Sequence, residues 1–426
     1  MRLPSDHPRR AELNDEVHAR PPEVLSAPAR ISYLALLIGP ERRAEEDAGL
    51  VALARRFGAE PPSPGDNHFS ADLGAFRLRW ERHTEFSRYM FAAPGVPSDP
   101  FAEPALDCVP TDFLEALPGQ TIAATHGALL AGGAEPLDVE TLSRTCFGGY
   151  ALIGSEIGGR TATALTDFRI HPDGFGRFLI EDRGLTPRQA GRYVQRLLEI
   201  DTYKTMALLA FPVARGLAPF LGRSEQELAE VTTRLADGGE ADEEALLDRL
   251  TRLEAEIESR GAENHFRFGA AAAYYDLVRG RIEELRETRI EGLQTFREFI
   301  ERRLSPAMNT CTAAARRQDA LAGRVARATQ LLSTRVDVTQ SRQNQDLLQS
   351  MNRRAQLQLR LQETVEGLSV AAVTYYIVGL VGYAVKGLGP LGVNVNPELA
   401  MAASIPVVLI LTGLGIRRIR RMVTRS

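Results

Sequence analysis

The chain of 426 residues contains three cysteines, one tryptophan and almost no lysine. The cysteines are odd in number and widely separated, which excludes a disulfide framework and favours reduced thiols in the cytosol. Of the 51 basic residues only Lys204 and Lys386 are lysines, which indicates a compositional bias rather than a demand for guanidinium chemistry. Hydrophobic residues make up 44% of the chain and charged residues 25%, which excludes a disordered or collagen-like protein.

The charge is unevenly divided along the chain. The formal net charge is -4, yet residues 367–426 hold six basic residues and one acidic residue, so the acidic excess lies entirely in the first 366 residues. Because the body of the chain, residues 1–366, is acidic overall and cannot neutralise phosphates, nucleic acid is not an expected partner. The first residues carry Asp6, Glu12 and Asp15 among arginines and have no apolar run, so we expect no secretory signal peptide.

Two stretches near the end, residues 367–385 and 399–416, contain no formal charge. At about 1.5 Å per helical residue, each is about as long as the hydrocarbon core of a bilayer is thick. They predict two transmembrane helices, with a pair of buried core helices as the alternative. Arginines lie at positions 353, 354 and 360 before the first run and cluster after Ile416. Since basic residues stay in the cytoplasm, we expect a multi-pass protein of the inner membrane with its N-terminal domain and C-terminus cytoplasmic.

Residues 1–185 mix strand and helix signals. Strands are predicted over 31–38, 76–80, 121–130, 150–153, 161–170 and 178–180, and a helix over 41–57. Residues 154–161 match the spacing of a phosphate-binding loop, but Arg160 replaces the essential lysine and strand-like residues follow. A glycine-rich hairpin is therefore the better interpretation.

The chain is predicted to be helical after Thr186, an N-cap followed by proline. Ser224 and Glu227 form a capping box that predicts a helix start, and apolar residues at 246, 250, 253 and 257 have helix-packing spacing. Ser305 is predicted to begin the longest helix. The expected fold class is α+β, with a cytosolic α/β domain over 1–185, a helical region over 186–304, a stalk helix over 305–366 and a transmembrane hairpin with a basic tail over 367–426.

The stalk is polar in its centre, where glutamine and asparagine are frequent. A polar helix of this kind is stable when it packs on other helices, which predicts a homo-oligomer or packing on the preceding helices.

Two polar clusters, residues 14–20 and 80–85, contain carboxylates beside imidazoles. His18, Glu81 and His83 could bind a divalent metal or transfer protons. On a strand, Glu81, His83 and Glu85 share one face, where the nearby arginines also favour a structural or interface role. Because no cysteine pair, serine-nucleophile motif or zinc pattern occurs, we expect no enzyme activity and no cofactor apart from a divalent cation such as magnesium.

A second pattern runs along the first predicted span. Polar and aromatic residues repeat at spacings of four and three and form one seam along the helix: Gln362, Glu366, Ser369, Val373, Tyr376, Leu380 and Tyr383. Polar groups facing lipid are costly, so Glu366, Ser369 and Tyr376 are expected to face protein or water. Two interpretations stay open, ordinary helix packing and a pore lining in a symmetric oligomer.

Several segments together carry a family resemblance: residues 13–22, 68–74, 80–86, 203–206 and 362–369. They resemble a membrane-anchored bacterial family known only as a domain of unknown function. The resemblance extends over nearly the whole chain. It implies membrane anchoring and no particular activity.

The architecture is similar to that of the CorA-type magnesium channels, in which a stalk helix continues into the first of two spans. Those channels carry Gly-Met-Asn after the first span, and Gly392-Val393-Asn394 is the nearest match. This resemblance implies a cation channel or transporter lined by Glu366, Ser369, Tyr376, Tyr383 and Asn394. The alternative function is a membrane-tethered scaffold or interaction protein without transport activity.

Overall fold

The computed structural model describes residues 5–11, 13–14, 22–133, 137–237, 243–388 and 396–423. Two compact units divide the chain, Met1–Thr329 and Gln330–Ser426, and each is described by itself. The division into four regions, at residues 185, 304 and 366, is finer than this and stays a prediction.

The first unit is built on a nine-stranded sheet in the order β2-β3-β4-β1-β5-β8-β7-β6-β9. Neighbouring strands are antiparallel except for β5 and β8, which are parallel. The strands are β1 (Ala29–Leu37), β2 (His68–Asp72), β3 (Arg77–Arg82), β4 (Phe86–Pro94), β5 (Gln120–Ala131), β6 (Ile153–Ile157), β7 (Ala162–Thr166), β8 (Gly176–Asp182) and β9 (Thr288–Arg289).

Helices of different lengths make up the rest of the described chain; those before residue 330 belong to the same unit as the sheet. The longer ones are α2 (Arg43–Arg56), α4 (Val139–Cys146), α5 (Pro187–Leu208), α6 (Ala210–Ala236), α7 (Glu243–Leu285), α8 (Phe296–Leu388) and α9 (Pro397–Val423). Short helical turns are η1 (Pro40–Arg42), η2 (Ala105–Cys108) and α3 (Thr111–Glu115). Together they confirm the predicted α+β class.

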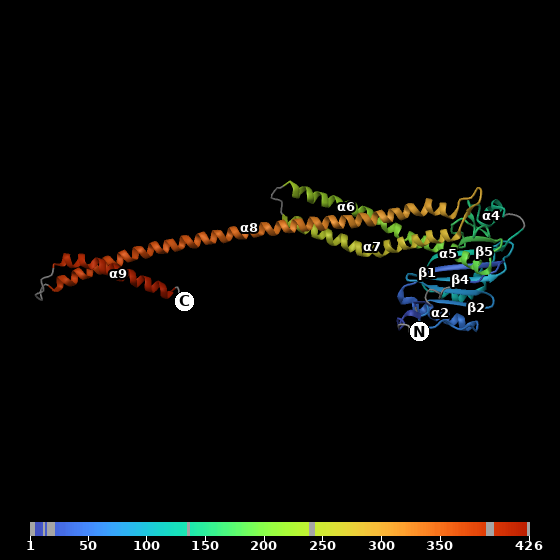
Figure 1. The fold of residues 1–426 in the computed structure, drawn as a ribbon, viewed down its shortest axis with the longest axis horizontal. Helices are drawn as coiled ribbons and strands as arrows, with labels where there is room; N and C mark the ends of the chain where they lie inside the picture. The colour runs from blue at the N-terminus through green and yellow to red at the C-terminus, as the bar shows by residue number, and fades with distance from the viewer. Residues whose placement is uncertain are drawn as a thin grey trace. The chain divides into compact units, whose positions relative to one another are not determined.

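The sheet is buried on both faces because helices cover each of them. On one face, Ile31 and Tyr33 of β1 join a core with α5, α7 and the first residues of α8. On the other face, Leu36 belongs to a separate core formed with α2, η2 and α3. Strand β4 is buried at every position but its last, as expected for a strand between two layers. Figure 1 shows α5 beside the sheet, next to β5.

The glycine-rich segment of residues 154–161 is a β-hairpin, as interpreted from the sequence. Strands β6 and β7 pair antiparallel, and Gly158, Gly159 and Arg160 between them have positive φ. A phosphate-binding loop would instead lead into a helix N-terminus, which supplies the amide donors.

The helix start predicted at Ser224 is wrong. Helix α6 begins at Ala210 and runs through Ser224, which is buried inside it. The apolar period is unbroken on both sides, since Leu221 and Leu228 are both buried, and the helix continues through Pro219 and Gly222 before the serine. The capping pattern is therefore only a coincidence of residue types on a continuous helix.

The start predicted for the longest helix, at Ser305, is also wrong. Helix α8 begins at Phe296, with Pro306 in its interior. Thr295 and Glu298 form the capping box: the Thr295 hydroxyl accepts from the Glu298 amide, and the Glu298 carboxylate accepts from the Thr295 amide. The caps of the first turn determine where the helix begins. Pro306, ten residues further on, lacks the backbone N–H of one helical hydrogen bond, and the helix continues through it.

Glu287 ties the beginning of α8 to the sheet. Its carboxylate accepts hydrogen bonds from the backbone amides of Phe296 and Arg297 and from the hydroxyl of Ser155 on β6. The next two residues form β9, which pairs with β6 at the edge of the sheet. One side chain and one short strand therefore join the helix to the strand layer.

The second unit contains the end of α8 and all of α9. The two helices meet closely at Gly382, where a β-carbon would lie 2.4 Å from the Met401 sulfur. Among the described residues of this hairpin, the buried side chains are Thr374 of α8 and Val408 of α9. Helical structure over both predicted runs is confirmed.

Within the part of the chain that the structure describes, three helical segments are long and apolar enough to cross a membrane: Pro187–Ala236, Phe296–Gly387 and Pro397–Arg418. The last two contain the predicted spans. The first was not predicted, and its residues include Leu197, Ile200 and Met206, which are buried in the core against the sheet.

Candidate functional site

Strand β3 divides its charged side chains between the two faces of the sheet. Trp80 and Arg82 point toward α2, where the buried carboxylate of Glu46 accepts hydrogen bonds from both. Glu81 alternates with them and points toward α5, as the two-residue period of a strand requires. The polar segment of residues 80–85 therefore supplies charged side chains to two separate buried clusters.

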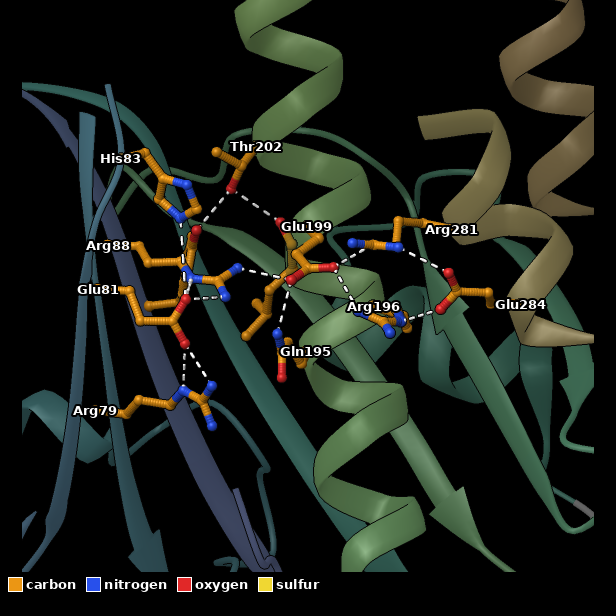
Figure 2. A network of polar contacts seen from close by, with 12 residues as sticks. Arg79, Glu81, His83, Arg88, Gln195, Arg196, Glu199, Thr202, Arg281 and Glu284 are labelled. Atoms are coloured by element: carbon orange, nitrogen blue, oxygen red, sulfur yellow. Dashed lines mark hydrogen bonds and ion pairs between the residues drawn. The ribbon is translucent and has the colours of Figure 1, made fainter. Parts of the chain in front are cut away.

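The larger cluster is a chain of ion pairs between the sheet and two helices (Figure 2). Arg79 and Arg88 both bind the carboxylate of Glu81, with nitrogen–oxygen distances of 2.6 Å from Arg79 Nε and 2.9 Å from Arg88 Nε. Arg88 Nη1 also donates to Glu199 of α5 at 2.8 Å. Arg88 thereby links a carboxylate of the strand layer to one of the helical layer.

Glu199 is the centre of the cluster. Besides Arg88, it accepts from Gln195 at 2.7 Å, from Arg196 at 2.9 Å and from Arg281 of α7 at 2.5 Å. Arg196 and Arg281 in turn both bind Glu284 of α7. The side chain of Glu199 is 2% exposed, so one buried carboxylate holds β4, α5 and α7 together.

The electrostatics of the cluster keep its carboxylates ionised. Burial alone would raise the pKa of Glu199, but the charges of Arg88 and Arg281 outweigh this and hold the pKa at about 2. The pKa of Glu81 is lowered in the same way, against burial, by Arg88 and Arg79. The pKa of Arg88 is raised because Glu199 and Glu81 outweigh its burial. None of these groups is poised to exchange a proton near neutral pH.

A small cavity of about 10 Å³ adjoins the cluster, lined by Tyr33, Arg79, Arg88, Gln195 and others. That volume is about what one water molecule needs, so no substrate fits there. The guanidiniums of Arg79, Arg88, Arg196 and Arg281 form ion pairs with the carboxylates of this cluster, Glu81, Glu199 and Glu284. The arrangement can fix the mutual position of the sheet and the helices, and it leaves no carboxylate open for chemistry.

The predicted metal ligands are partly brought together. His83 Nε2 lies 4.0 Å from Glu81 Oε2, and the His83 ring stacks on Phe86. Glu85, on the same loop, binds Arg267 and Tyr274 of α7. Among the described residues, no group of three His, Cys, Asp or Glu side chains could hold a metal. His18 lies outside the described residues, so a metal site that includes it stays a prediction.

Four of the five predicted pore-lining residues lie on α8. Tyr376 is 72% and Tyr383 77% exposed, and Ser369 is exposed with its hydroxyl donating to the carbonyl of Val365. Glu366 lies one turn before Ser369 on the same side. Asn394 lies outside the described residues. The structure thus places Ser369, Tyr376 and Tyr383 on the side of α8 away from the buried Thr374, with Glu366 half-exposed at the margin of that side.

Comparison with known proteins identifies a family. Residues 5–423 match the family described as "Protein of unknown function (DUF3422)". The chain belongs to the DUF3422 family. The match extends over nearly the whole chain and confirms the family resemblance noted from the sequence, whereas no match links the chain to the CorA-type channels. No curated protein and no solved structure matches it.

Several central residues of this DUF3422 protein could not be found from local sequence patterns. Glu199 and Arg281 lie on helices whose sequences have an ordinary amphipathic pattern, and Glu46 lies on a helix with many charged surface residues, so none of the three stands out in the sequence. A local signal existed only for Arg88, because an arginine within the apolar run of β4 must be buried and therefore paired. Its partner Glu199, 111 positions away, has no local sequence pattern that predicts its burial.

Proposed function

We propose that this protein is a homo-oligomeric, membrane-tethered scaffold of the inner membrane, with its sheet domain and both chain ends in the cytoplasm. The observation that carries the proposal is an exposed apolar stripe on α8, opposite to the face that packs on α9. The basic residues that flank the two hydrophobic runs support the orientation. The satisfied carboxylates of the buried cluster support a non-catalytic role.

The apolar stripe consists of residues separated by whole numbers of helical turns: Leu347, Met351, Leu361, Val365, Tyr376, Leu380 and Tyr383. Each of these side chains is between 59% and 77% exposed. Residues on the opposite side of the same helix, such as Thr374 and Gly382, face α9 instead. The hairpin therefore uses one face of α8 and leaves the other open along its length.

A second copy of the chain is the occupant that fits this stripe. Lipid can cover Tyr376, Leu380 and Tyr383 within the predicted span, but it cannot cover Leu347, Met351 and Leu361, which precede that span. Since the membrane hairpin gives every copy the same polarity, identical stripes meet in parallel and in register. Arg354 and Gln358 interrupt the stripe, as polar positions that fix the register of a helical assembly do.

The test is the mass of the full-length protein in detergent, measured by light scattering. Leu361→Glu places a charge in the stripe and is expected to reduce the mass toward that of a monomer. Leu331→Glu is the matched control, because Leu331 is equally exposed on α8 but lies on the opposite side of the helix. A monomeric wild type, or equal masses for the wild type and Leu361→Glu, would overturn the proposal.

Cation conduction is a second candidate function, favoured by the polar members of the same face. In a symmetric assembly Glu366, Ser369 and Tyr376 would form successive rings able to receive a hydrated divalent cation such as magnesium. The test is magnesium flux into liposomes holding the wild type, Ser369→Leu or the control Ala402→Leu on an exposed position of α9. Flux that is absent from the wild type, or unchanged by Ser369→Leu, removes this candidate and leaves the scaffold.

A further inference from the structure

A second cavity is a groove between two antiparallel helices of the first unit, α7 and the beginning of α8, which lie side by side (Figure 1). Its volume is about 430 Å³, and along α7 it extends from Gly261 to Asp276, about 22 Å. Its floor is apolar and contains Phe268, Ala271 and Met308. Helix α6 packs on another side of the same helix pair, so no described helix or strand covers the groove.

Two hydrogen bonds show which residues of the two helices lie at the same level. Nε2 of Gln318 on α8 donates to the carbonyl of Ile257 on α7 at 3.3 Å. Towards the other end of the groove, the hydroxyls of Tyr275 on α7 and Ser305 on α8 are hydrogen-bonded to each other. Since the helices run in opposite directions, the first groove residues of α7 lie beside the last groove residues of α8.

Charged residues form two rims along this groove, one on each helix. The α7 rim carries Glu258 and Asp276, which are about five helical turns apart and so lie on the same side. The α8 rim carries Arg302 and Arg316, which are about four turns apart. Asp319, one turn after Arg316, lies on the floor side of this rim. The four rim residues are exposed, and none of them forms an ion pair with another described residue.

We infer that this groove binds the same groove of a second copy, with the two copies related by a twofold axis parallel to the helices. Such an axis keeps every residue at its level and places the acidic rim of each copy against the basic rim of the other. Arg316 then meets Glu258 of the second copy, and Arg302 meets Asp276 of the second copy. The two apolar floors face each other and form the core of a four-helix bundle.

The rim charges select this arrangement over the other twofold one. An axis that crosses the helices at right angles would bring acidic rim against acidic rim and basic rim against basic rim, which is unfavourable. The favoured axis gives both copies the same direction, as two copies anchored in one membrane require. In this respect the inference rests on the proposed function. The surface is a different one, since it involves α7 and lies in the first unit, whereas the apolar stripe lies in the second.

The test is chemical cross-linking of the full-length protein in membrane vesicles. One chain carries Glu258→Cys, a co-expressed chain carries Arg316→Cys, and a short bismaleimide joins thiols that lie close together. A band of twice the chain mass is expected from this mixture, and far less of it from either variant alone. The matched control is Glu263→Cys with Thr310→Cys, two exposed positions at one level that do not line the groove.

A charge reversal tests the pairing of the rims, with Asp276→Cys and Arg302→Cys as the cross-linked pair. Arg316→Glu is expected to reduce the cross-linked fraction by about fivefold or more, because opposite charges become like charges in both copies of the contact. Adding Glu258→Arg makes the charges opposite again and is expected to restore the fraction. Since all substituted side chains are exposed, the variants should fold, which circular dichroism checks.

The inference is overturned if Glu258→Cys and Arg316→Cys cross-link no more than the control pair, as when another molecule occupies the groove. It is overturned as well if Glu258→Arg does not restore the cross-link of the Arg316→Glu variant. An oligomeric mass without the groove cross-link would remove this inference and leave the proposed assembly through α8. A groove cross-link in a protein whose mass Leu361→Glu does not change would remove the stripe contact and leave this inference.

Discussion

Glu199 is the residue whose loss we expect to destabilise the first unit most. The substitution Glu199→Gln keeps the size of the side chain but removes its charge. Arg88, which is 9% exposed and 2.8 Å away, then keeps only Glu81 as a partner. Removing one partner of a buried ion pair costs about 3 to 5 kcal/mol, because a charge is left uncompensated away from water. Since Arg196 and Arg281 retain Glu284, we expect the lower end of that range, about 3 kcal/mol.

Trp80 provides the assay. It is the only tryptophan in the chain, it is 1% exposed, and it lies on β3 beside Glu81. Its fluorescence during denaturation in guanidinium chloride therefore follows unfolding of the sheet that Glu199 supports. The free energy of unfolding comes from the midpoint and slope of the transition. Glu45→Gln is the control, because Glu45 pairs with Arg42 at the surface. This substitution should lower the free energy of unfolding by less than about 1 kcal/mol.

A double variant tests whether the cost arises from unpaired charge. Glu199→Leu combined with Arg88→Met removes both charges, so the pair should lose less stability than the sum of the two single variants. The reasoning is refuted if Glu199→Gln costs no more than Glu45→Gln. It is refuted as well if the double variant loses the full sum, because the two side chains would then act independently.

Three further predictions follow from other parts of the first unit. Burial lowers the pKa of His126 to about 4, so the folded state excludes a proton that the unfolded state binds below about pH 6.5. The free energy of unfolding should therefore fall by up to about 3 kcal/mol as the pH drops from 6.5 to 4. Denaturation of His126→Gln should show a weaker dependence of this free energy on pH. Glu46→Gln should cost about 2 to 3 kcal/mol and shift the emission of Trp80, whose indole donates to that carboxylate, as a fluorescence melt would report. Thr295→Ala should cost about 1 kcal/mol and speed amide hydrogen exchange in the first turn of α8 only; unchanged exchange there would disprove the cap.

Much of the fold follows from the sequence because its signals are local. The alternation of Phe76, Leu78 and Trp80 predicts a strand, and β3 is found at Arg77–Arg82. The two charge-free runs predict the helices of the hairpin. The predictions at Ser224 and Ser305 are wrong for the same reason: each residue carries a start signal but lies inside a helix whose apolar period begins before it. Thr295 and Glu298 carried the correct signal for α8.

The buried cluster was only half visible in the sequence. The segment 80–85 stands out because carboxylates, imidazoles and arginines occur together within six residues. What these groups bind depends on α5 and α7, which are brought to the sheet by apolar contacts spread over the whole core. Pairing between Arg88 and Glu199 is therefore a product of the tertiary fold and has no periodic signature in the chain. The same holds for Lys204 and Phe168, whose contact requires the loop conformation at residue 168.

The joint at Glu287 has a mechanical consequence for the first unit. A pull on α8 reaches the sheet through the two residues of β9, through the carboxylate that holds the first amides of the helix, and through Phe296, Ile300 and Leu304, which are buried in the core. All of these contacts lie within the first three turns of the helix, so a load on α8 enters the first unit at the start of the helix. Glu287→Gln would weaken the polar part alone, so we expect the helix to detach at a lower force while the apolar contacts keep the rest of the resistance.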